Sequence, residues 1–67
     1  MVTIDNIEYQ PIFVKDGKEI YILVRNYPFQ KVYGRGADEK SRIANAKSNF
    51  KLQVEAAKDV EVSWESK

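Results

Sequence analysis

The side chains that most often perform catalysis are absent from this chain or lack their usual partners. It contains no histidine and no cysteine, which excludes thiol nucleophiles, thiolate metal sites, disulfides and the most common proton-transfer residue. No histidine is present to activate the hydroxyl groups, which belong to Thr3, Ser41, Ser48, Ser63 and Ser66. We therefore expect no enzymatic activity and no bound cofactor.

The carboxylates and glycines match no pattern for a metal or phosphate site. Most acidic residues lack calcium-loop spacing and are expected at the surface: Asp5, Glu8, Asp16, Glu19, Glu55, Asp59, Glu61 and Glu65. Gly34-Arg35-Gly36 lacks the further glycines and the Lys-Ser/Thr ending of a phosphate-binding loop. We interpret it as a turn and predict no metal site.

Basic residues that could contact a phosphate backbone gather in the middle of the chain. The net charge is only +1, but segment 25–51 holds seven basic and two acidic residues. On a helical wheel its lysines lie along one side of an apolar stripe, and two preceding basic residues can extend this row. We call the set the basic flank; it comprises Lys31, Arg35, Lys40, Lys47 and Lys51.

The basic flank has two interpretations. It could follow the phosphates of a nucleic acid, with Tyr27 or Tyr33 stacking on a base or sugar. Alternatively, its lysines cover the edge of the core with their aliphatic stems and keep their ammonium groups in water.

A second candidate surface is apolar. One face of a predicted hairpin, turned away from the helix, carries large side chains, and a leucine lies on the far side of the helix; these residues are Ile12, Val14, Tyr21, Leu23 and Leu52. Apolar patches of this kind mark partner or dimer surfaces. The alternatives are that terminal segments fold across this face, or that these side chains simply lie on the open side of a two-layer sheet.

These surfaces depend on a hairpin whose turn is the strongest local signal in the sequence. Asp16-Gly17 between two apolar runs is typical of a two-residue type I′ loop, which places Lys15 opposite Lys18 and Phe13 opposite Ile20. Alternation then assigns one face to the core, formed by Tyr9, Pro11, Phe13, Ile20, Ile22 and Val24.

The remaining elements follow from periodicity. Short strands are predicted at 2–4 and 29–33, and a terminal strand at 60–65 that returns to the sheet edge or pairs near residues 2–4. A helix is expected from the N-cap Asp38 to about Lys58. Its apolar stripe consists of Ile43, Ala46, Phe50, Val54 and Ala57.

Together these elements predict one α+β domain over residues 1–67. It is a small antiparallel sheet of three to five strands packed on one long amphipathic helix, in the order β-β-(β)-α-β. The composition, 43% hydrophobic and 31% charged, is that of an ordinary globular chain. The first ten residues resemble neither a signal peptide nor a membrane span, and with the absence of cysteine they favour a cytoplasmic location.

The strands followed by Gly34-Arg35-Gly36 and a helix resemble the second half of a double-stranded-RNA-binding domain. That family begins with a helix that this chain lacks, and Glu39 and Arg42 stand where its lysine cluster is expected. The order of three strands and a helix is also similar to small DNA-binding domains of some integrases. This likeness is one of topology alone, so we assign no family.

The sequence thus predicts a small non-enzymatic binding module without membrane contact. The first hypothesis is a regulatory module that contacts the nucleic-acid backbone through the basic flank. The second is a protein-interaction or inhibitory accessory protein, of the type that mobile elements encode, which uses the half-apolar sheet face. Homodimerisation through that face or through an edge strand is compatible with both.

Overall fold

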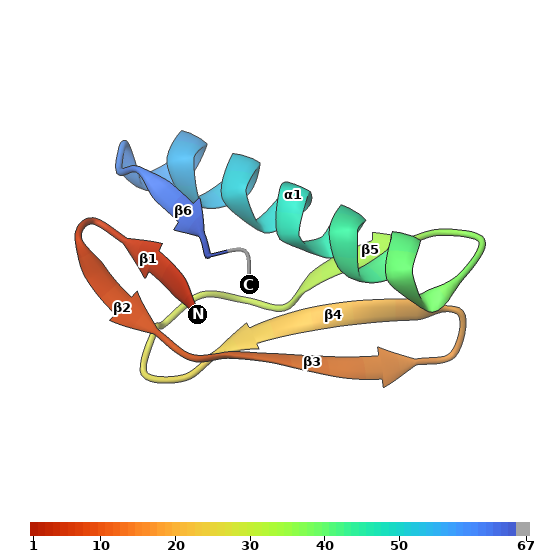
Figure 1. Cartoon of the computed structure of the whole chain (residues 1–67). Coiled ribbons are helices and arrows are strands. Elements are labelled where there is room, and N and C mark those ends of the chain that lie inside the picture. The colour runs from red at the N-terminus through yellow and green to blue at the C-terminus, as the bar shows by residue number, and fades with distance from the viewer. Residues whose placement is uncertain (66–67) are drawn as a thin grey trace.

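The computed structural model describes residues 1–65. In Figure 1, one long helix lies across a set of short antiparallel strands. The elements in chain order are β1 (Val2–Ile4), β2 (Ile7–Tyr9), β3 (Pro11–Asp16), β4 (Glu19–Val24), β5 (Val32–Arg35), α1 (Glu39–Lys58) and β6 (Val62–Trp64). The predicted α+β class is confirmed.

The strands form two sheets where we predicted one. The first has the order β2-β1-β6 and the second the order β3-β4-β5. The terminal strand pairs with β1, as expected, with Val2 opposite Trp64 and Ile4 opposite Val62. The two sheets lie on the same side of α1 and share one core (Figure 1).

The type I′ loop that we predicted between β3 and β4 is found instead between β1 and β2. Asp5 and Asn6 both have positive φ, the requirement of a type I′ loop, and they join β1 to β2. Between β3 and β4 only Gly17 has positive φ, as in a type II′ loop, and Asp16 is opposite Glu19. The predicted Asp16-Gly17 loop is therefore wrong by one position, because Gly17 is the first loop residue.

This difference changes the register of β3 against β4 by two residues. Phe13 lies opposite Ile22 and Lys15 opposite Ile20. Because side chains alternate with a period of two, a shift of two leaves each residue on its predicted face. Ile20, Ile22 and Val24 are accordingly buried.

The third strand of the second sheet begins later than predicted. Segment 29–31 is not a strand, and β5 starts at Val32. The chain turns here instead, since the N–H of Tyr27 donates to the carbonyl of Val24 and that of Phe29 to the carbonyl of Tyr27. The Phe29 side chain packs against the core from this turn.

Six of the eight aromatic residues form a continuous chain through the interior. Each ring has its centroid 5.3 to 6.3 Å from the next. In order, the rings are Tyr9, Tyr27, Phe29, Phe50, Trp64 and Phe13. Phe50 is the helical member, and it links the loop before β5 to β6.

The helix lies directly on β5 at Gly34. A Cβ atom at Gly34 would clash with the backbone of Arg42 and Ala46 and would lie 2.7 Å from the Cα of Ala46. The absent side chain thus permits helix and strand to approach closely. Ala46, Phe50 and Val54 form the buried stripe, whereas Ala57, predicted to continue it, is exposed.

Both ends of α1 are capped. Asp38 is the predicted N-cap, and its carboxylate accepts a hydrogen bond from the N–H of Ser41 at 2.7 Å. This bond lowers the pKa of Asp38. Asp59 ends the helix in the left-handed conformation and its N–H donates to the carbonyl of Glu55. Among the described residues, no helix combines the length and apolar character that a membrane span requires.

Candidate functional site

The second sheet has one face against α1 and one face that no described element covers. In Figure 1 the helix lies above β3, β4 and β5, and nothing lies below them. We call this lower surface the outer face. Its side chains form three rows across the strands: Ile12 and Leu23, with Lys31 of the turn before β5 beside them; Val14, Tyr21 and Tyr33; and Asp16, Glu19 and Arg35.

The rows follow from strand pairing. Ile12 is opposite Leu23, and Val14 is opposite Tyr21, which is in turn opposite Tyr33. Residues directly opposite each other point to the same face, and so these side chains share a surface. The predicted placement of Ile12, Val14, Tyr21 and Leu23 on the face turned away from the helix thus corresponds to the observed geometry.

Large apolar side chains on the outer face are accessible to solvent. Ile12 is 38% exposed and Tyr33 is 37% exposed. Val14, Tyr21 and Leu23 are half-buried. Phe29, Gln30 and Lys31 join Leu23 and Tyr33 around a shallow hollow at one end of the face.

The middle row contains the two aromatic residues that the interior chain does not use. The ring centroids of Tyr21 and Tyr33 lie 5.2 Å apart, and the ammonium group of Lys31 lies 4.8 Å from the Tyr21 centroid. The Tyr33 hydroxyl donates to the Asp16 carboxylate at 3.1 Å. The pKa of Tyr33 is raised above its ordinary value, mainly by desolvation and secondly by this hydrogen bond. Its phenol therefore stays protonated near neutral pH.

The third row is charged. The Arg35 guanidinium donates from Nε to the Glu19 carboxylate at 2.8 Å. This hydrogen bond raises the pKa of Arg35, and the group remains a cation at any physiological pH. Only Nε is used in this contact, which leaves the other guanidinium N–H groups of Arg35 to face outward.

The structure divides the basic flank between two surfaces. Lys31 and Arg35 belong to the outer face, whereas Lys40, Lys47 and Lys51 project from α1 on the other side of the sheet. The alternation of β5 turns Arg35 away from the helix, and Lys31, in the turn before β5, places its ammonium group over the Tyr21 ring of the outer face. The five residues do not form one continuous row.

Two of the helical lysines are in contact with the body of the protein. The Lys47 ammonium lies 5.4 Å from the Trp64 ring centroid and 5.9 Å from that of Phe13. Lys51 donates to the carbonyl of Val62 at 3.2 Å and lies 3.8 Å from the Glu55 carboxylate. These contacts correspond to the alternative interpretation, in which lysines cover the edge of the core.

Leu52 does not belong with the other apolar candidates. It is 63% exposed and lies on α1, which covers the opposite side of the sheet from the outer face. A single exposed leucine is ordinary on a protein surface. The predicted partner surface is therefore reduced to its four sheet residues, and Tyr33 joins them.

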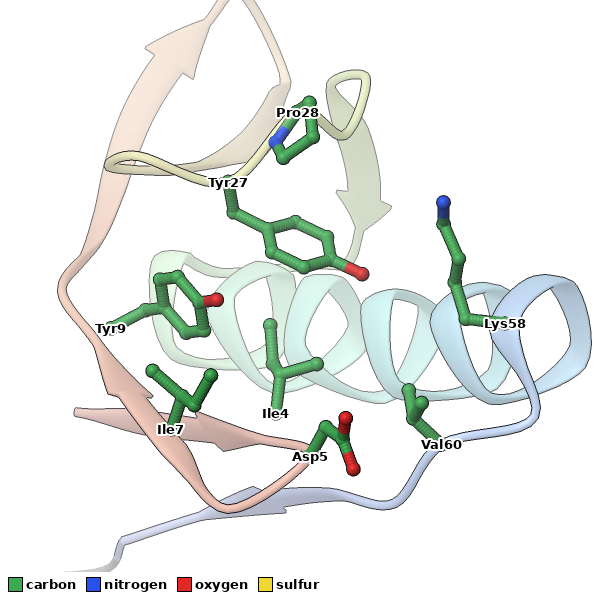
Figure 2. A pocket seen from close by; sticks show the side chains of 8 residues that line it. All are labelled: Ile4, Asp5, Ile7, Tyr9, Tyr27, Pro28, Lys58 and Val60. Carbon is green, nitrogen blue, oxygen red and sulfur yellow. The ribbon is translucent and has the colours of Figure 1, made fainter.

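A cleft of about 240 Å³ lies at another end of the molecule, where sequence analysis indicated no site. Figure 2 shows Tyr9 and Tyr27 along one side, Ile4, Ile7 and Val60 below them, and Asp5 and Lys58 at the rim. Within residues 1–65, all four non-glycine residues with positive φ belong to the loops around this cleft: Asp5, Asn6, Asn26 and Asp59. Each is an Asp or Asn, which tolerates this conformation, and so the positive φ angles are ordinary for such loops.

The described residues include no cluster of three or more histidine, cysteine, aspartate or glutamate side chains that could hold a metal ion. Their buried side-chain polar atoms all have hydrogen-bond partners, and none of these groups points unpaired into a cavity.

Comparisons with known proteins give no relative: no family model, no curated protein and no solved structure matches this chain.

Proposed function

We propose that this chain is a small, non-enzymatic protein-interaction domain, and that the outer face is its binding surface. The observation that carries the proposal is an uncovered sheet face with aliphatic and tyrosine side chains at its centre and charged side chains at one end. Interfaces between proteins commonly have this arrangement of an apolar centre and a polar rim.

The residue types of the outer face support binding to a protein. Tyrosine is enriched at interface hot spots because its ring gives a large contact area and its hydroxyl a hydrogen bond. Tyr33 and Tyr21 lie side by side at the centre, next to Val14. The hydrogen bond from Tyr33 to Asp16 fixes the exposed ring before a partner binds, which reduces the entropy lost on association.

Nucleic-acid binding is the second candidate, and one observation favours it. Exposed Tyr33 has Lys31 and Arg35 on the same face, a combination of stacking ring and cations that suits a single strand. Against it, Glu19 neutralises Arg35, and Asp16 adds another negative charge to the face. The apolar row has no role in contacting phosphates.

A matched pair of lysine variants tests the proposal. Leu23→Lys places a charge in the outer face, and Leu52→Lys places the same charge on an exposed helical site away from it. Wild type and both variants are used as baits in the cells that produce the protein, after circular dichroism has established that each variant is folded. Retained proteins are identified by mass spectrometry and the purified candidates are titrated by calorimetry.

We expect a protein that binds wild type and Leu52→Lys equally, and Leu23→Lys at least tenfold more weakly. Binding should persist in about 0.5 M salt, because ionic screening has little effect on apolar contacts. Equal affinity for both lysine variants would contradict the proposal. Retention that nuclease or salt removes would instead favour the nucleic-acid alternative.

A further inference from the structure

We propose that the occupant of the outer face is a second copy of this chain, packed face to face about a two-fold axis that runs parallel to β4. This inference rests on the proposed function and adds the partner and its orientation. Sheets pack face to face with their strands within about 30° of each other, so such a pair is an ordinary β-sandwich arrangement.

The symmetry follows from the strand order. Rotation about an axis parallel to β4 exchanges the places of β3 and β5 and leaves β4 opposite its own copy. Each row of side chains then meets the same row of the second molecule. In the middle row, Val14 faces Tyr33 of the other copy, and Tyr21 faces Tyr21.

Charge complementarity selects this orientation. In the third row, Asp16 on β3 comes opposite Arg35 on β5 of the other copy, and the symmetry makes this contact twice. Glu19, at the centre of the row, faces Glu19 of the other copy, and each of these carboxylates accepts a hydrogen bond from Arg35 of its own chain. Arg35 uses Nε for Glu19 in its own chain, and its remaining N–H groups are free for a second carboxylate. An axis perpendicular to the strands would instead bring Lys31 over Arg35, and these two cations would repel each other.

The edges of the sheet are less suitable for association. On β5, the outward carbonyls of Tyr33 and Arg35 accept hydrogen bonds from the side-chain amides of Asn49 and Asn45. On β3, Pro11 has no N–H to offer a neighbouring strand. A face-to-face dimer uses neither edge.

The small size of the outer face limits the affinity of the proposed dimer. Three rows of three side chains are fewer than the 20–30 residues that each partner contributes to a standard interface. We expect a weak, reversible dimer with a dissociation constant on the order of 100 µM. Sedimentation equilibrium from about 10 µM to about 2 mM spans this range.

A charge exchange tests the orientation. Asp16→Arg places arginine opposite Arg35 of the second copy, and Arg35→Asp places aspartate opposite Asp16. Each variant alone should associate at least tenfold more weakly than wild type. An equimolar mixture should regain wild-type association, because both contacts between positions 16 and 35 then join opposite charges, while Glu19 faces Glu19 as it does in wild type. The neutral variants Asp16→Asn and Arg35→Gln provide milder versions if either reversal impairs folding.

The outcomes separate the inference from the proposed function. A wild-type chain that stays monomeric to about 2 mM overturns the dimer. A dimer that both charge reversals leave unchanged overturns the orientation. If, in addition, a different protein binds wild type and not Leu23→Lys, the outer face remains a binding surface and only its occupant was assigned wrongly. Absence of both kinds of binding contradicts both proposals.

Discussion

The Asn49 side-chain amide donates to the backbone carbonyl of Tyr33 at 2.9 Å, and the Asn45 amide does the same one helical turn earlier, to Arg35. Both asparagines project from α1 to the free edge of β5. Unpaired carbonyls on an edge strand invite pairing with another chain. The helix thus protects the edge that borders the outer face.

We predict that Asn49→Asp lowers the free energy of unfolding by about 1 kcal/mol, because it removes a donor and places a carboxylate against a carbonyl. Ser48→Asp is the matched control, since it adds the same charge at an exposed neighbouring position. Urea unfolding of both variants measures the difference. Equal stability of the two would show that the Asn49 contact contributes nothing to the fold.

Close approach of β5 and α1 predicts that Gly34→Ala is among the most damaging substitutions. The added Cβ meets backbone atoms of Arg42 and Ala46, which no rotamer change can move away. We expect a loss of about 3 kcal/mol or more, a large part of the roughly 3–10 kcal/mol expected for a domain of this size.

Gly17→Ala serves as the control for this substitution. Gly17 has open space around it and a φ of 63°, so alanine there adds only the cost of the left-handed conformation, about 1–2 kcal/mol. Thermal unfolding of both variants checks the order. A Gly34→Ala protein as stable as Gly17→Ala would contradict the observed packing of helix on strand.

Phe50 joins the two sheets through the interior aromatic chain. It is 1% exposed and makes edge contacts with Phe29 and Trp64, whose centroids lie 5.8 and 5.9 Å from its own. Phe50→Ala should cost about 3–5 kcal/mol in unfolding free energy. Leu52→Ala, on the same helix but exposed, should change the free energy of unfolding by less than about 0.5 kcal/mol, because little contact is lost and alanine is the better helix former.

The N-cap predicts a pH dependence of stability. The pKa of Asp38 is lowered in the folded state by the hydrogen bond from Ser41, so folding favours the charged carboxylate. Its contribution is complete above the carboxyl's unfolded pKa and disappears as the pH falls through the lower folded pKa. Asp38→Asn retains a capping side chain that does not titrate.

We therefore expect wild type to lose more stability than Asp38→Asn when the pH falls below about 4. Unfolding midpoints measured from pH 6 to pH 2 make the comparison, with each protein referred to its own value at pH 6. Parallel pH profiles for the two proteins would rule out this role of Asp38.

Local signals in the sequence were sufficient to predict most of the helix and strand positions. The cap at Asp38 and the uninterrupted stretch to Lys58 gave the helix bounds, and alternation gave the faces of β3 and β4. The predicted register was wrong, because Asp16-Gly17 fits a type I′ loop, which needs positive φ at both positions, and Gly17-Lys18 equally fits a type II′ loop, which needs it only at the first. The division into two sheets was missed because Asp5-Asn6 is a weaker turn signal than a dipeptide with glycine.

The candidate surfaces show what one-dimensional patterns omit. A helical wheel gives the direction of Lys47 relative to α1, but not the Trp64 ring that β6 places beside it. Likewise, the closeness of Arg35 to the helix in sequence says nothing of its side of the sheet, which the alternation of β5 decides. The outer face combines residues from three strands, and only correct pairing brings them together.

The most direct test of the outer face as a protein-binding surface is a comparison of photo-crosslinking yields. A photoreactive amino acid replaces Tyr33 on the outer face or Leu52 on the helix, both of them exposed, and the cells are irradiated. We predict adducts at position 33, with a second copy of the chain or another protein, that resist nuclease and are digested by protease, and few adducts at position 52. Equal yields at the two positions, or adducts at position 33 that nuclease removes, would contradict the account.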